Sequence, residues 1–253
     1  MSTSKRAYDR EQRERRVESA GLGRRSVVKR ILAVPLRAGN QFRKRTKRRW
    51  TQLLLRLGPS YRNLKRLGII DDFNGYPTEA FAPIYADLWG LYLVVMERKP
   101  AVVLELGGGY STFVLAHAAR TLRGKGHEVK FFSVDESDHW QRVVMNQMPK
   151  DLRPFVHFHW SEPRVAEVEG ERVSIFQSLP VDSCDFLYVD GGHVPGVGSA
   201  ADALLLERNA PSDYAIQIDG RKKTVAFLKR RLKLDYDVGP GLNGVQTLFV
   251  RRS

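Results

Sequence analysis

Residues 102–116 read VVLELGGGYSTFVLA, and this stretch decides the fold. An apolar run leads into Glu105, three glycines follow, and a second apolar stretch begins after Ser111-Thr112. The pattern is typical of a buried strand that turns sharply into a helix. Glycines allow a positive φ and let a ligand approach the bare main chain, while N–H groups at a helix start suit a carboxylate or phosphate. We therefore expect a ligand-binding strand–loop–helix unit here.

Beyond this unit, short β-rich runs alternate with helical stretches. Alternating apolar strands and helices predict a mostly parallel sheet covered by helices. The last two runs are joined by a Gly/Pro/Asn turn, which indicates an antiparallel hairpin. The sequence thus predicts a doubly wound, mostly parallel seven-stranded α/β sheet with a C-terminal antiparallel hairpin. Its strand-like runs are 101–106, 130–135, 155–160, 184–190, 214–219, 234–238 and 245–251.

Charge is concentrated at the N-terminus. Residues 1–50 hold 17 Lys/Arg against 4 Asp/Glu, whereas residues 51–253 hold 25 basic and 24 acidic side chains. Such an arm favours anionic partners, namely RNA, DNA or an acidic membrane surface. The alternative is a solvated tail without a specific partner.

The composition suggests three parts. We expect a flexible basic arm over 1–48, a helical extension over 49–100 that packs on the core, and the α/β domain over 101–253. In the extension, apolar residues recur at helical spacing, and Gly58-Pro59 and Pro100 should each end a helix. These helical positions are Trp50, Leu53, Leu54 and Leu57, then Ile84, Leu88, Leu91 and Val95.

The single cysteine, Cys184, excludes an internal disulfide and a cysteine-rich zinc site. It suits a reducing cytoplasm. The N-terminal sequence contains neither a secretory signal nor an apolar run of the roughly 20 residues that a membrane span needs. We therefore expect a cytoplasmic protein, with the arm able to hold it at a membrane surface.

Acidic residues gather at the predicted strand ends, where doubly wound sheets bind their ligands. Burying a carboxylate is costly unless it is paired, so packing alone seldom explains an acid at such a place. These acids are Glu105, Asp135, Glu136, Glu162, Asp190 and Asp219. A dinucleotide cofactor would want G-x-G-x-x-G after the first strand, but Thr112 stands at the last glycine position. A nicotinamide-dependent enzyme is therefore an alternative, with Thr112 as the feature against it.

The motifs LELGGGYST, FSVDES and FLYVDGGH together resemble the class I S-adenosylmethionine-dependent methyltransferases. They are most similar to a bacterial branch whose first motif ends in Gly-x-Ser-Thr and whose fourth strand ends in Val/Ile-Asp-Gly. Glu105, Gly107 and Gly109 match the first motif, and Ser111 stands at its third glycine position. The resemblance spans about 80–251 and implies a Rossmann-like fold with S-adenosylmethionine as cofactor.

The resemblance also implies roles for single residues. Gly107 and Gly109 would carry the methionine part of the cofactor, with Ser111 in the same loop. Glu105 would orient the loop or accept from the cofactor's amino group. Asp135 would accept from the ribose hydroxyls, unless it only caps a helix. Glu162 would contact adenine, unless it is a surface loop acid.

The catalytic candidates are Asp190 and His193, which share a glycine-rich loop after the fourth predicted strand of the parallel sheet. An acceptor hydroxyl must lose its proton, and a positioned histidine or carboxylate can take it. His193 could instead be an exposed loop residue, and Asp190 could bind a metal with Asp219, although we expect no metal. The motif used on nucleobase amino groups, Asn/Asp-Pro-Pro-aromatic, is absent.

We therefore expect methyl transfer to an oxygen of a small molecule or glycan. One alternative is an RNA-modifying methyltransferase recruited by the basic arm over 1–48. Another is a methyltransferase-like binding protein without catalytic activity.

Overall fold

The computed structural model describes residues 58–76, 82–192, 194, 197, 200–241 and 244–252. The predicted basic arm, the predicted helical residues 50–57 and the catalytic candidate His193 lie outside these residues. The chain divides into two compact units, Met1–Arg62 and Asn63–Ser253, and the sheet belongs to the second. Within the described ranges, no helix is long and apolar enough to cross a membrane.

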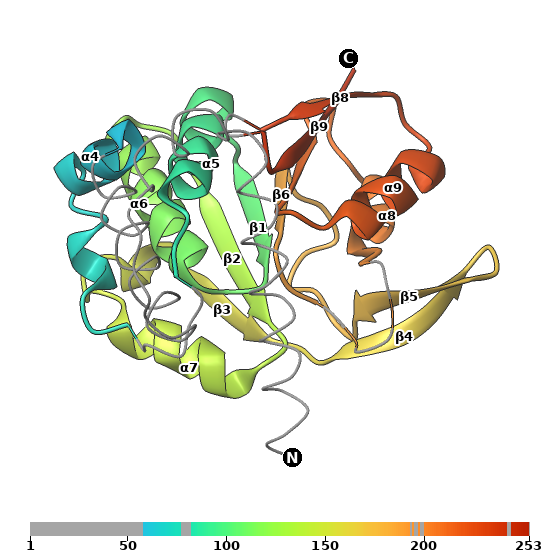
Figure 1. Cartoon of the computed structure of the whole chain (residues 1–253), viewed down its shortest axis with the longest axis horizontal. Coiled ribbons are helices and arrows are strands. Elements are labelled where there is room, and N and C mark those ends of the chain that lie inside the picture. The colour runs from blue at the N-terminus through green and yellow to red at the C-terminus, as the bar shows by residue number, and fades with distance from the viewer. Residues whose placement is uncertain are drawn as a thin grey trace, which may run out of the picture. The chain divides into compact units, whose positions relative to one another are not determined.

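A seven-stranded sheet lies at the centre of the second unit, in the order β3-β2-β1-β6-β7-β9-β8 (Figure 1). The five strands from β3 to β7 are parallel, whereas β9 runs antiparallel to both β7 and β8. The predicted doubly wound sheet with its antiparallel C-terminal pair is confirmed. The strands are β1 (Val102–Leu106), β2 (Lys130–Asp135), β3 (His157–Trp160), β6 (Phe186–Val189), β7 (Ala215–Ile218), β8 (Tyr236–Pro240) and β9 (Thr247–Arg251).

Helices cover both faces of this sheet. One face of β1 presents Leu104 and Leu106 to a buried cluster that includes side chains of α8 and α9. The opposite face presents Glu105, which contacts α6, and α5 packs on α6. The helices are α4 (Pro59–Arg66), η1 (Asp71–Phe73), α5 (Tyr85–Arg98), α6 (Tyr110–Gly124), α7 (Asp138–Gln147), η2 (Arg153–Phe155), α8 (Asp202–Glu207) and α9 (Lys222–Arg231).

Two proline signals have different outcomes. α5 ends as expected just before Pro100, with Lys99 in the left-handed conformation at its C-cap. At Gly58-Pro59 the structure shows the start of a helix, because α4 begins at Pro59, and the helix predicted to end there lies outside the described residues. Proline suits a first helical turn, since its missing N–H would have no partner within the helix there.

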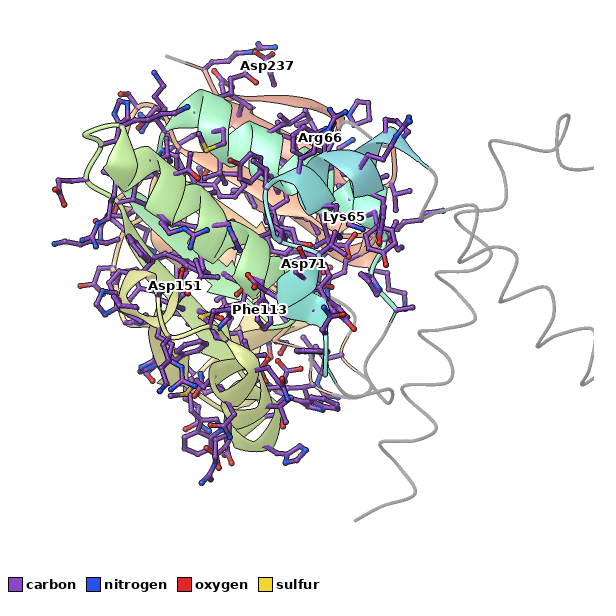
Figure 2. The ribbon with its side chains drawn as sticks, turned by 90° about the vertical axis from the view of Figure 1, so that its left-hand side faces the viewer. Lys65, Arg66, Asp71, Phe113, Asp151 and Asp237 are labelled. Atoms are coloured by element: carbon purple, nitrogen blue, oxygen red, sulfur yellow. The ribbon has the colours of Figure 1, made fainter. Side chains whose placement is uncertain are left out.

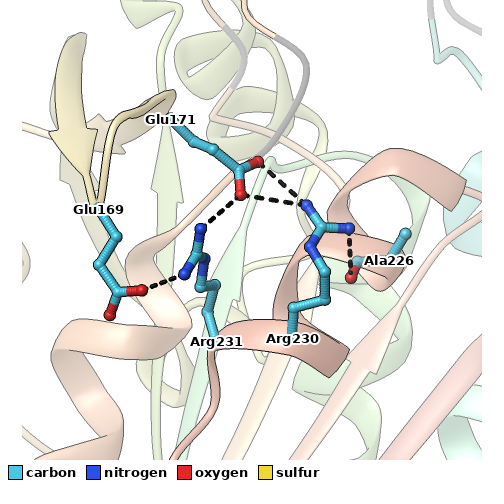
Figure 3. Close-up of polar contacts among 5 residues, drawn as sticks. All are labelled: Glu169, Glu171, Ala226, Arg230 and Arg231. Carbon is cyan, nitrogen blue, oxygen red and sulfur yellow. Dashed lines mark hydrogen bonds and ion pairs between the residues drawn. The ribbon is translucent and has the colours of Figure 1, made fainter.

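A two-stranded hairpin that the sequence did not predict projects from the domain (Figure 1). Its strands, β4 (Pro163–Val168) and β5 (Glu171–Phe176), are joined by Glu169-Gly170, and both turn residues have positive φ. This is the geometry of a two-residue hairpin turn whose twist matches that of the strands. Arg230 and Arg231 of α9 bind the hairpin's acids, with Arg230 contacting Glu171 at 3.0 Å (Figure 3).

The strand order reverses at β1, which pairs with β2 on one side and with β6 on the other. In doubly wound sheets, ligands bind outside the carboxyl ends of the strands at such a switch point. The loops that follow β1, β2 and β6 therefore define the place to look for a site.

Candidate functional site

The loops after β1 and β6 meet through their glycines. Gly107 has φ +98°, and a Cβ on it would lie 2.3 Å from the backbone nitrogen of Gly191. A Cβ on Gly191 would likewise lie 2.3 Å from the Cα of Gly107. Real Cβ atoms do not approach that closely, so both positions require glycine for backbone packing. The sequence predicted that Gly107 carries the cofactor. Its close contact with Gly191 is a second reason for glycine at this position, one that the motif spacing did not indicate.

Glu105 lies beneath the glycine loop and is fully buried. Its Oε2 accepts hydrogen bonds from the hydroxyls of Thr112 and Ser133, both at 2.7 Å. Thr112 also accepts from the N–H of Gly109 at 2.9 Å. The threonine that departs from the dinucleotide motif therefore links the strand-end acid to the loop. Because Glu105 has no exposed surface, its contribution is to hold the loop in place.

Burial has a large effect on Glu105. It raises the pKa of this carboxyl to about 7, and the nearby Asp190 carboxylate adds to the rise. The hydroxyls of Ser111, Ser133 and Thr112 oppose it without cancelling it. Near neutral pH the glycine loop therefore rests on an acid that is partly protonated, since removing a carboxylate from water disfavours its charged form.

Asp135, at the end of β2, joins the loop from the other side and is almost buried, with 6% of its surface exposed. Its Oδ2 accepts from the N–H of Gly108 at 2.8 Å, and its Oδ1 accepts from the N–H of Ser137 at 2.7 Å. The N-cap of α7 is Ser137, whose side chain accepts from the N–H of Trp140. The alternative in which Asp135 caps the helix itself is therefore wrong, and the carboxylate instead ties the β1 loop to the β2 loop.

The loop after β6 is held on two sides. From the loop after β2, Glu136 accepts from the N–H of Gly192 at 2.9 Å. From the unexpected hairpin, the hydroxyl of Ser174 donates to the carbonyl of Gly192 at 2.7 Å, and the ring of Phe176 lies against the same glycine. β5 therefore shapes the loop that carries the catalytic candidates, which no local sequence signal indicated.

Asp190 leaves β6 at the carboxyl edge and is about one-quarter exposed. The guanidinium of Arg221, which follows β7, donates to the Asp190 carbonyl and lies 3.8 Å from its Oδ1. Asp219 lies just ahead of this arginine and is almost buried. Among the described residues, no three His, Cys, Asp or Glu side chains gather closely enough to hold a metal ion.

Aromatic side chains cover the start of α6. Phe73 and Tyr76 lie 4.7 and 4.4 Å from the ring of Tyr110, and both also contact Phe113. Figure 2 shows η1, the turn that ends at Phe73, beside the part of α6 that carries Phe113. Burial raises the pKa of Tyr76 well above its usual range, and Tyr110 and Asp135 add to the rise. The sequence did not identify Tyr76 as a neighbour of the glycine loop, because its segment indicated only a turn. The two aromatic residues within 71–76 were the available signal that this turn packs against the domain.

The other site residues predicted from the sequence lie in three different environments. Gly109 is extended and borders open space, since a Cβ there would meet nothing within 4 Å. Ser111 is buried in the first turn of α6. Glu162 is exposed at the base of the hairpin, with its carboxylate 3.5 Å from the side-chain nitrogen of Gln177. Glu162 therefore stands apart from the buried network around Glu105 and Asp135.

Comparison with known proteins agrees with this architecture. Residues 104–216 match a family model described as a methyltransferase domain. No curated protein matches the chain in sequence.

Solved structures similar to the chain include three methyltransferases at 13% identity. The methyltransferase PaMTH1 of Podospora anserina, solved with S-adenosylhomocysteine (SAH), has a TM-score of 0.49 and aligns over 88% of this chain and 100% of its own. An O-methyltransferase of Bacillus cereus, also solved with SAH, has a TM-score of 0.45 and aligns over 75% of this chain and 90% of its own. The O-methyltransferase TomG of Streptomyces achromogenes, solved with S-adenosylmethionine, has a TM-score of 0.43 and aligns over 81% of this chain and 94% of its own. The family match thus covers residues 104–216 of this chain, and the sheet that contains them is doubly wound with an antiparallel C-terminal pair.

Proposed function

We propose that the protein transfers a methyl group from S-adenosylmethionine to an oxygen of a small molecule or glycan. The observation that carries the proposal is the hydrogen bond from the Gly108 N–H to Asp135. It joins the glycine loop of β1 to the acid of β2 at the switch point of the sheet. A cofactor with an amino acid part and a nucleoside part would need both groups at once.

The described residues fit such a cofactor. Gly109 leaves open space beside bare backbone at the start of α6. Asp135 lies at the loop with a carboxylate, whose oxygens accept from the N–H groups of Gly108 and Ser137, and a carboxylate is the acceptor that ribose hydroxyls require. Tyr110 presents an aromatic ring at the same helix start. Glu105 acts from below, since its hydrogen bonds orient the loop instead of reaching the ligand.

When bound, S-adenosylmethionine supplies a methyl group on a positively charged sulfur, and transfer joins the acceptor oxygen to that carbon as the carbon–sulfur bond breaks. The protein's part is to align the acceptor with that bond and to take its proton. We assign proton acceptance to the loop with Asp190 and His193. Gly192, between these two residues, is held by hydrogen bonds to Glu136 and Ser174, and an aligned displacement requires such positioning.

The proposal is tested by isothermal titration calorimetry with S-adenosylmethionine and with SAH. We expect the wild type to bind both, Asp135→Asn to bind at least about tenfold more weakly, and Asp135→Ala to bind more weakly still. Asp182→Asn removes an exposed acid elsewhere and should leave binding unchanged. If Glu162 contacts adenine, Glu162→Gln should weaken binding by a smaller factor. No binding by the wild type contradicts the cofactor assignment, and undiminished binding by both Asp135 variants contradicts the ribose role.

A second candidate, an RNA-modifying methyltransferase, rests on the net charge of +13 over residues 1–50. Deleting residues 1–48 should then leave SAH affinity intact and weaken binding to RNA. Neutralised phosphates release counterions, so RNA binding by the full chain should fall steeply with salt. The same titration with anionic vesicles separates RNA from a membrane surface. Salt-independent binding would show that the arm does not act through its charge.

A further inference from the structure

A cavity of about 180 Å³ lies at the carboxyl edge of the sheet, away from the glycine loop. Its walls come from α9, from the residues after β7 and from the start of β9. Thr247 in its wall pairs with Ile218, the last residue of β7, so the cavity borders the same edge as the β6 loop. Neither the glycine motif nor the loop with Asp190 accounts for it.

Three cations line this cavity, namely Arg221, Lys222 and Lys229. Lys222 and Lys229 stand two turns apart, on one side of α9, with the apolar Val225 and Ala226 between them in the wall. No carboxylate of the described residues forms an ion pair with either lysine. The cavity is therefore an apolar hollow rimmed by unneutralised positive charge.

The other cations of α9 show that this arrangement is local. Arg230 and Arg231 both bind the acids of the β4–β5 hairpin (Figure 3). Arg221 is engaged as well, because its guanidinium binds the carbonyl of Asp190 and lies 3.8 Å from its carboxylate. Arg230 and Arg231 are thus neutralised within the protein, whereas Lys222 and Lys229, on the cavity side of α9, are left to meet an external anion.

The hollow has room for a small anionic group. A cavity of roughly 150 Å³ holds a molecule such as benzene, so a volume of about 180 Å³ accommodates a phosphate or carboxylate with a few attached atoms. Arg221 lines the cavity and also binds Asp190, which lies in the loop where we propose that the methyl acceptor binds. We propose that the cavity binds a phosphate or carboxylate group of the methyl acceptor. This inference rests on the proposed function, because it takes the protein to be a methyltransferase.

The test is a titration of the full-length protein, saturated with SAH, with inorganic phosphate and separately with acetate, followed by amide chemical shifts. We expect saturable shifts at Gly220, Val225 and Thr247. Lys222→Gln combined with Lys229→Gln should weaken this binding at least about fivefold, because it removes both unpaired charges. Lys150→Gln combined with Lys233→Gln removes the same charge from exposed positions elsewhere and should leave the binding unchanged.

The outcomes separate the two proposals. Saturation by phosphate alone assigns a phosphorylated acceptor, and acetate binding of equal strength assigns a carboxylate. Shifts confined to the basic arm, or equal affinity in the Lys222/Lys229 variant, overturn the cavity proposal. Calorimetry with SAH on the same variant isolates the cofactor site. Intact SAH binding alongside a failed phosphate titration rejects only the cavity, whereas absent SAH binding in the wild type rejects the proposed function.

Discussion

Replacing Glu105 by glutamine should make the protein respond differently to pH. The carboxyl is fully buried, and its pKa rises from 4.5 when exposed to about 7 in the folded protein. Glutamine has nearly the same shape and keeps a carbonyl oxygen that can accept from Thr112 and Ser133. The substitution therefore removes an ionisation while preserving the support of the glycine loop.

The sign follows from proton binding. Between pH 4.5 and 7 the unfolded chain has lost the Glu105 proton while the folded protein keeps it. The free energy of unfolding of the wild type therefore falls as pH rises through this window, and it levels off above pH 7. One pKa unit corresponds to about 1.4 kcal/mol, so the full effect is on the order of 3 kcal/mol. Of this, about 2–3 kcal/mol falls between pH 5 and pH 8.5.

The assay is urea denaturation of wild type and Glu105→Gln at pH values from 5 to 8.5. We expect the variant to gain stability relative to the wild type by about 2–3 kcal/mol across this range, since all other groups cancel in the comparison. Glu128→Gln provides a matched control, because it makes the same chemical change at a side chain that is 94% exposed. A difference between wild type and Glu105→Gln that stays constant with pH would refute the reasoning.

Three further predictions follow from the packing. Gly107→Ala should lower the free energy of unfolding by at least about 2 kcal/mol, because its Cβ would clash with Gly191. Gly109→Ala should change this free energy by less than about 1 kcal/mol, because its Cβ would meet nothing within 4 Å. Equal effects of the two substitutions in urea denaturation would contradict the close approach of Gly107 to Gly191. Cys184 is 2% exposed, and burial raises the pKa of its thiol well above the usual range. Iodoacetamide should therefore label it only when the protein is unfolded in urea. Rapid labelling of the folded protein, measured by mass spectrometry, would disprove this. Gly170→Ala should cost about 1 kcal/mol, because φ +77° at this hairpin turn favours glycine, and unchanged thermal stability would argue against that turn.

The sheet could be predicted because its strands carry their own signals. The central parallel strands β1, β6 and β7 are short, mostly apolar runs that are followed by a glycine or an acid, and burial on both faces makes such runs nearly continuous. The hairpin of β4 and β5 could not be found this way. Its tip is polar and exposed, and Arg230 and Arg231, about 60 residues further along the chain, hold it in place. Such long-range ion pairs leave no local periodicity.

The candidate site divides in the same manner. The sequence by itself placed glycines after β1 and acids at the strand ends, because the backbone conformation and the cost of burying charge restrict which residues can stand there. Only the tertiary structure decided their partners. Gly107 meets Gly191, 84 positions away, and Asp135 holds Gly108, while Glu162 remains on the surface. These contacts depend on the order in which strands pair, and strand order is fixed by packing of the whole sheet, not by any one segment.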